Sequence, residues 1–101
     1  MDVLAEQRQD VATLKLSGRF DFDAHRAFKR AYEPCLAAAD VREIRVDLGG
    51  LEHTANSVPG MLLVLRERGH ALDKQVRLVN ARGAVKDLLD TTNFGELFAT
   101  L

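Results

Sequence analysis

Apolar and polar residues alternate in two separate stretches of the chain, and this two-residue period predicts strands with one buried face. The stretches lie at residues 11–17 and 44–48. Apolar residues within 76–79 predict a third strand, and residues 3–5 predict a short strand that pairs beside the first. Gly49-Gly50 follows the second strand, and because glycine pairs are typical of turns we expect that strand to end there.

Between these strands the apolar spacing changes to steps of three and four, which predicts amphipathic helices. The first covers residues 23–39, with Asp23 as its N-cap and with Pro34 predicting a kink or early break. The second covers residues 57–70 and carries five consecutive apolar residues, so we expect it to be the most buried helix. A third helix covers residues 84–89. Four residues that follow it are expected to close the core: Phe94, Leu97, Phe98 and Leu101.

The alternation of strands and helices predicts the α/β class, with a mostly parallel central sheet of about four to five strands and helices packed against it. The amino-terminal strand can pair antiparallel in such a sheet. Composition is even along the chain, and 101 residues suit one core, so residues 1–101 are expected to form one domain. Loops that leave the carboxyl ends of parallel strands meet at one edge. We therefore expect residues 18–23 and 49–57 to lie together.

Composition and charge exclude several classes of protein. The 14 basic and 15 acidic residues leave a net charge of −1, which argues against a general nucleic-acid binder. The chain has no secretory leader pattern and no run of about 18 apolar residues, so we expect a cytoplasmic protein without direct membrane insertion. One cysteine, Cys35, and three histidines do not supply a structural zinc site.

Several segments follow the order of a known signature. Residues 46–50 are Val-Asp-Leu-Gly-Gly, a short loop then ends in Asn56-Ser57, and the apolar helical segment 60–68 follows. Residues 16–21 lead into the first helix, and residues 78–98 complete the order. In this order and spacing the chain resembles STAS domains, the fold of bacterial anti-sigma factor antagonists, over nearly its whole length. The resemblance implies a regulatory protein that binds an anti-sigma factor or a partner of the serine kinase or phosphatase type.

The same resemblance places a phosphorylated serine on Ser57. In the family, the loop after the central strand usually contains Asp-Ser-Ser followed by Gly or Ala, and the partner that is both kinase and anti-sigma factor phosphorylates the second serine. This chain departs from that motif, with Ala55 at the acid, Asn56 at the first serine and Val58-Pro59 at the small residue and leucine. The acceptor is retained while its neighbours have changed.

A phosphate on Ser57 would alter binding without unfolding the domain. The residue lies where the second helix begins, and unpaired amides and the helix dipole favour an anion there. The phosphate adds about −1.5 to −2 charge units at neutral pH, which a docking partner must dehydrate or repel. The residue types alone also permit a simple N-cap role, worth about 1 kcal/mol. That cap is Ser57 or, because the residue before a proline avoids helical geometry, Val58.

Other side chains at this edge complete the predicted partner surface. It comprises Asp21, Asp23, His53, Asn56, Ser57, Val58 and Met61. The spacing of Asp21, Asp23 and His25 resembles a metal cluster, but a helix that starts at Asp23 breaks their alignment, so capping and solvated charge are favoured. His53 is alternatively an ordinary exposed loop residue. Cys35 lies on the apolar face of the first helix, as an inert core thiol does.

The chain carries no recognisable catalytic constellation. Gly49-Gly50 lacks the further glycines of a dinucleotide fingerprint and the Lys-Ser/Thr pair of a P-loop. Ser57 has His53 as its nearby candidate base, with no evident orienting acid. We therefore expect a protein that is not an enzyme and uses neither cofactor nor metal. The expected function is that of an anti-sigma factor antagonist switched at Ser57.

Two other functions stay open on the sequence. The first is that of a non-switching STAS subunit in a lipid-transport or scaffold assembly, which the altered loop residues permit. The second is binding of a small ligand at the sheet edge. The oligomeric state is also left open.

Overall fold

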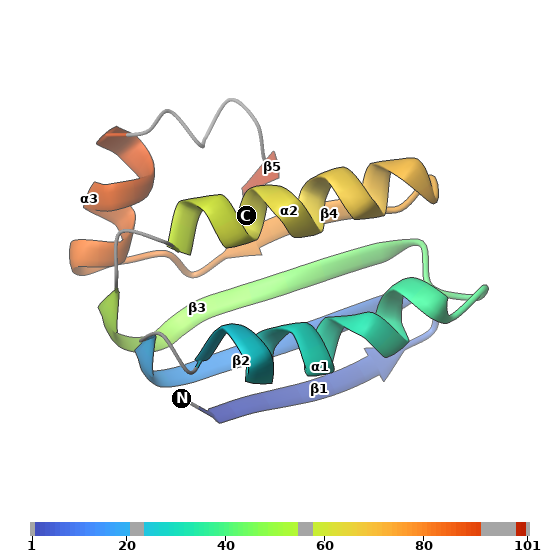
Figure 1. The fold of residues 1–101 in the computed structure, drawn as a ribbon, viewed down its shortest axis with the longest axis horizontal. Coiled ribbons are helices and arrows are strands. Elements are labelled where there is room, and N and C mark those ends of the chain that lie inside the picture. The colour runs from blue at the N-terminus through green and yellow to red at the C-terminus, as the bar shows by residue number, and fades with distance from the viewer. Residues whose placement is uncertain (1, 21–23, 55–57, 92–98, 101) are drawn as a thin grey trace.

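The alternating stretches form a five-stranded sheet in the computed structural model of the chain, which describes residues 2–20, 24–54, 58–91 and 99–100 (Figure 1). Three helices connect the strands. In chain order the elements are β1 (Asp2–Arg8), β2 (Val11–Phe20), α1 (Ala24–Ala37), β3 (Glu43–Thr54), α2 (Val58–Ala71), β4 (Gln75–Val79), α3 (Gly83–Thr91) and β5 (Ala99–Thr100).

The strands lie in the order β1-β2-β3-β4-β5, with β1 antiparallel to β2 and every other neighbouring pair parallel. This confirms the predicted α/β class, the mostly parallel sheet and the antiparallel pairing of the first strand. The two-residue strand β5 is not predicted by the sequence pattern, since it is too short to show a period. It pairs with Arg77 and Leu78 of β4.

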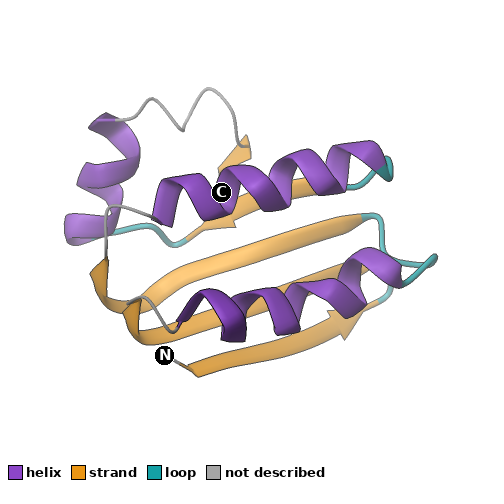
Figure 2. Cartoon of the chain, in the orientation of Figure 1, coloured by secondary structure: helices purple, strands orange, loops and turns teal. Residues whose placement is uncertain are grey.

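Helices α1 and α2 both lie on the same face of the sheet. In Figure 2 they are the two long helices in front of the strands. The alternation in β2 explains this arrangement, because Leu14 and Leu16 point under the helices with at most 2% of their surface exposed, while Lys15 and Ser17 point to the other face and are exposed. The result is a two-layer domain with a helix-covered face and a face that is open along β1 and β2.

Strand β3 does not end at Gly49-Gly50, contrary to the expected turn, but continues to Thr54. Strand β3 pairs with β2 from Val11↔Glu43 to Phe20↔Thr54, and the pairing register shifts between Lys15 and Ser17 and again after Gly18. Gly50 lies at the first shift, where a Cβ would come within 2.7 Å of the Leu16 carbonyl oxygen. The glycine therefore permits close approach of two strands at a bulge rather than a change of direction.

Helix α1 continues through Pro34 to Ala37, so the expected early break does not occur. Proline costs this helix one main-chain hydrogen bond near its C-terminal end, and burial of Tyr32 and Leu36 on either side offsets that loss. Lys74 supports the segment after the helix, because its buried ammonium group donates hydrogen bonds to the carbonyl oxygens of Ala38 (2.6 Å) and Val41 (2.5 Å).

Helix α2 is less enclosed than its five consecutive apolar residues predict. Leu62 and Leu65 are buried to 1% exposure or less, but Val64 is 52% exposed. The predicted N-cap Asp23 and the four expected core residues after α3 lie outside the described residues. Among the helices that the structure describes, none has the length and apolar character needed to cross a membrane.

Candidate functional site

Two neighbouring strands end side by side at the carboxyl edge of the sheet. Arg19 of β2 pairs with His53 of β3, and Phe20 pairs with Thr54. The next described residues are Ala24, where α1 begins, and Val58, where α2 begins. The sequence places the partner surface on residues 18–23 and 49–57. The pairing brings the described parts of these two stretches, residues 18–20 and 49–54, together as neighbouring strands rather than loops.

The structure describes the side chain of Met61 in this predicted surface but not those of the other six residues. Asp21, Asp23, Asn56 and Ser57 lie outside the described residues. His53 is the penultimate residue of β3 and Val58 is the first residue of α2, and their side chains lie outside the described part of the chain as well. Their roles in binding a partner thus stay predictions. Met61, in the first turns of α2, is partly buried and packs against the core.

A groove runs between α1 and α2 near their amino ends. Its volume is about 170 Å³. The lining residues come from both helices and are His25, Phe28, Lys29, Tyr32, Met61 and Val64. Phe28 and Tyr32 form the floor, because they are buried and stack edge to face with ring centroids 5.2 Å apart. Val64 stands exposed at the rim, so the groove combines an apolar floor with an apolar side chain that a partner can contact.

An ion pair links α1 and α2 beyond the carboxyl-terminal end of the groove. The guanidinium group of Arg68 on α2 donates two hydrogen bonds to the carboxylate of Glu33 on α1, at 2.8 and 3.1 Å. The same guanidinium lies 5.6 Å from the centroid of the Tyr32 ring. The hydrogen bond from Arg68 lowers the pKa of Glu33, and the hydrogen bond to Glu33 raises the pKa of Arg68. This bidentate ion pair connects the two helices in a defined geometry.

The helix layer is more basic than the chain as a whole. Helices α1 and α2 carry five basic residues, Arg26, Lys29, Arg30, Arg66 and Arg68, against two acidic residues, Glu33 and Glu67. Counting histidine as neutral, this gives the layer a net charge of +3, whereas the whole chain carries −1. The surface around the groove is therefore complementary to acidic groups.

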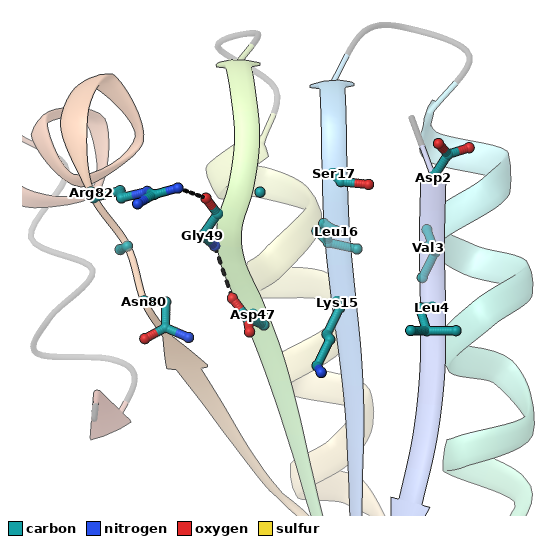
Figure 3. A pocket seen from close by; sticks show the side chains of 12 residues that line it. Asp2, Val3, Leu4, Lys15, Leu16, Ser17, Asp47, Gly49, Asn80 and Arg82 are labelled. Carbon is teal, nitrogen blue, oxygen red and sulfur yellow. Dashed lines mark hydrogen bonds between the residues drawn. The ribbon is translucent and has the colours of Figure 1, made fainter.

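A second hollow, of about 790 Å³, lies on the face of the sheet that α1 and α2 leave uncovered (Figure 3). Its polar lining includes Lys15 and Asp47 from the middle strands, with Asn80 and Arg82 after β4. Arg82 donates a hydrogen bond to the carbonyl oxygen of Gly49 (2.6 Å), and the Gly49 amide donates to the Asp47 carboxylate (2.9 Å). Since that amide is already bonded, it is not free to bind a phosphate.

Sequence reasoning missed the groove residues contributed by α1. Tyr32, Phe28 and Lys29 appear in the sequence only as parts of an amphipathic helix, and their approach to α2 depends on how both helices cross the sheet. The separation of 35 residues between Glu33 and Arg68 gives no local signal for their ion pair. Among the described residues, no group of three or more His, Cys, Asp or Glu side chains is placed to hold a metal ion.

Comparison with known proteins gives the family. The sequence model of the family described as "Mlab, STAS domain" matches residues 3–99. The chain belongs to the STAS domain family. A STAS-domain containing protein of Pseudomonas aeruginosa is 38% identical to this STAS domain over 86 residues, which cover 85% of this chain and 83% of that protein.

Solved structures share the fold of this STAS domain at low sequence identity. The anti-sigma factor antagonist SpoIIAA in its unphosphorylated form superimposes with a TM-score of 0.84 at 16% identity, covering 99% of this chain and 88% of that one. An anti-sigma factor antagonist from Mycobacterium paratuberculosis gives 0.85 at 20% identity, covering 98% and 83%. The phosphorylated form of the Bacillus SpoIIAA gives 0.77 at 15% identity, covering 99% and 91%. At these identities the likeness shows a common fold.

Proposed function

We propose that this STAS domain is a cytoplasmic regulatory module of the anti-sigma factor antagonist type, which binds an anti-sigma factor or a similar regulatory protein and releases it when Ser57 is phosphorylated. One observation carries this proposal. The ends of β2 and β3 lie paired, with Phe20 opposite Thr54, and a groove lies between the two helices, α1 and α2, that follow these strands in the chain. The module acts by binding and uses no catalytic group.

The groove provides the chemistry for docking. An apolar side chain of the partner can pack against Val64 and Met61, and an acidic group of the partner can face Lys29. Contacts of this kind combine an apolar centre with a charged rim, as specific interfaces do. A phosphate on Ser57 would bring about −1.5 to −2 charge units to the same edge, and it would oppose the approach of an acidic partner.

Relatives support the switching step by analogy. SpoIIAA, which shares the fold, is an anti-sigma factor antagonist and has been solved in a phosphorylated and an unphosphorylated form. In this chain the proposed acceptor is Ser57, and Asp21, Asp23, His53, Asn56, Val58 and Met61 form the proposed surface around it. The serine kinase or phosphatase that would act on Ser57 is itself a proposed partner.

The test compares three baits in extracts of the native cell: the unaltered domain, Ser57→Ala and Ser57→Asp. We expect the unaltered domain and Ser57→Ala to retain the same partner, identified by mass spectrometry as an anti-sigma factor or serine kinase. Ser57→Asp is expected to bind the purified partner at least about tenfold more weakly, since a charge forced against a docked surface costs more than 1.4 kcal/mol. Incubation with the partner and ATP should add one phosphate to the unaltered domain and none to Ser57→Ala.

Two results would contradict the proposal in different ways. Equal affinity of the partner for Ser57→Asp and the unaltered domain would remove the phosphorylation switch. Retention of a transport ATPase, unaffected by substitution at position 57, would instead assign the domain to a non-switching assembly. Val64→Lys serves as a second probe because it changes the groove rim and leaves Ser57 intact.

A further inference from the structure

The outer edge of the sheet is formed by β1, a seven-residue strand with its carboxyl end at Arg8. Strand β2 pairs with its inner edge, and no strand among the described residues pairs with its outer edge. Six of its seven side chains are exposed, including Leu4 at 56%. An edge of this length presents a row of main-chain donors and acceptors to any strand that matches it.

The two ends of this edge strand carry opposite charges on the same face of the sheet. Asp2, Leu4, Glu6 and Arg8 lie on the open face of the sheet, because each pairs with an outward-facing residue of β2. Val3, Ala5 and Gln7 lie on the helix-covered face, opposite the buried residues of β2. Asp2 at the beginning and Arg8 at the end of this seven-residue strand therefore lie on the same face, six residues apart.

We infer that two copies of this chain associate through antiparallel pairing of β1 with β1, centred on Ala5. This register aligns all seven residues of both strands and sets Asp2 of each copy opposite Arg8 of the other. A shift that centres the pair on Leu4 would place Asp2 opposite Glu6, and centring on Glu6 would place Glu6 opposite itself. Like charges directly opposite each other destabilise a strand pair, so the charges select the central register.

A hollow next to the edge strand offers space to a side chain of the second copy. A hollow of about 330 Å³ lies between α1 and β1 on the helix-covered face. Ala5, Ala12, Ala31, Pro34 and Cys35 are among the residues that line it. In the central register, Val3 of the second copy lies opposite Gln7, next to this mostly apolar hollow. A two-fold axis perpendicular to the sheet relates the copies, as in most symmetric dimers, and joins the two sheets into one.

The pairing leaves the proposed partner site accessible. The two-fold axis keeps both helix layers on the same side of the joined sheet, so each groove between α1 and α2 remains open. Loss of the dimer and loss of partner binding are therefore separate events, and the dimer proposal does not depend on the proposed function.

Charge reversal tests the register in the purified full chain by sedimentation velocity over a range of concentrations. Asp2→Arg and Arg8→Asp are each expected to weaken the dimer about tenfold, because each turns two opposite-charge pairs into like-charge pairs. The double variant restores both pairs with their signs exchanged, so its affinity should return to within about threefold of the unaltered chain. Both side chains are exposed, and circular dichroism should show an unchanged fold.

Cross-linking tests the centre of the pair independently. Ala5→Cys in a Cys35→Ser background is expected to form a disulfide between copies, since directly opposite residues have Cβ atoms about 4.5–5.5 Å apart and a small approach brings them to the roughly 3.5–4.5 Å of a disulfide. The matched control is Gln7→Cys in the same background, where the two cysteines lie four residues out of register and should not join. A chain that stays monomeric at high concentration, or a dimer insensitive to both reversals with equal cross-linking at positions 5 and 7, would overturn the inference.

Discussion

Replacement of Gly50 by alanine probes the contact that carries β3 to the site. Gly50 lies at the register shift between β2 and β3, upstream of the pairing of Phe20 with Thr54. If close strand approach at this bulge positions the carboxyl edge, a single added methyl group should disturb it. The substitution adds no charge and removes no side chain, so its effect reports on packing alone.

The structure supplies the expected magnitude. A Cβ at Gly50 would lie 2.7 Å from the Leu16 carbonyl oxygen and 3.0 Å from the Ser17 Cβ. Both atoms belong to or adjoin the main chain of β2, so the strands must separate by several tenths of an ångström. Overpacking of this kind costs about 1–3 kcal/mol. For a domain of this size each kcal/mol shifts the Tm by about 4–8 °C, so we expect the Tm to fall by about 5–20 °C.

The assay is thermal and urea unfolding followed by circular dichroism, with two further glycines as internal controls. Gly49→Ala should cost less, because its Cβ would meet the Asn80 Cβ and an Asp47 carboxylate oxygen at 3.2 Å, which are longer contacts than the 2.7 Å approach at Gly50. Gly60→Ala should raise the free energy of unfolding by up to about 1 kcal/mol. Gly60 lies in α2, where alanine is favoured over glycine, and the added Cβ would meet no neighbouring atom within 4 Å. If Gly50→Ala unfolded at the same temperature as Gly60→Ala, the proposed role of the bulge would be wrong.

Three other predictions follow from burial and charge. Val64→Ala should lower the free energy of unfolding by less than about 1 kcal/mol and Leu65→Ala by about 2–5 kcal/mol, measured by urea denaturation, because the first side chain is 52% exposed and the second is fully buried. Because Arg68 lowers the pKa of Glu33, their ion pair contributes stability above the ordinary glutamate value of 4.5 and loses it as the pH falls through the lowered value. An NMR titration should find the Glu33 midpoint below the ordinary value, with a return toward it in Arg68→Gln. Burial raises the pKa of the Cys35 thiol, so its alkylation near neutral pH should be slower in the folded chain than in urea, and equal rates would contradict its burial.

Periodicity in the chain was sufficient for the class of fold. Local alternation placed β2, the first half of β3 and β4, and helical spacing placed α1, α2 and α3, because burial of one face imposes a period that needs no knowledge of distant residues. The alternation within 44–48 also correctly predicted which side chains in that part of β3 are buried. The predicted edge, where the strand ends meet, followed from the rule for parallel strands.

Long-range contacts decided the remaining features. The pair Gly49-Gly50 has the local character of a turn, yet the carbonyl oxygen of Leu16 in the neighbouring strand makes glycine necessary within a continuing β3. The groove between α1 and α2 and the ion pair of Glu33 with Arg68 likewise depend on residues that are far apart in the chain. These residues meet only after both helices pack on the sheet. A local pattern records which side of an element is buried, whereas the identity of the neighbour that buries it is a property of the assembled fold.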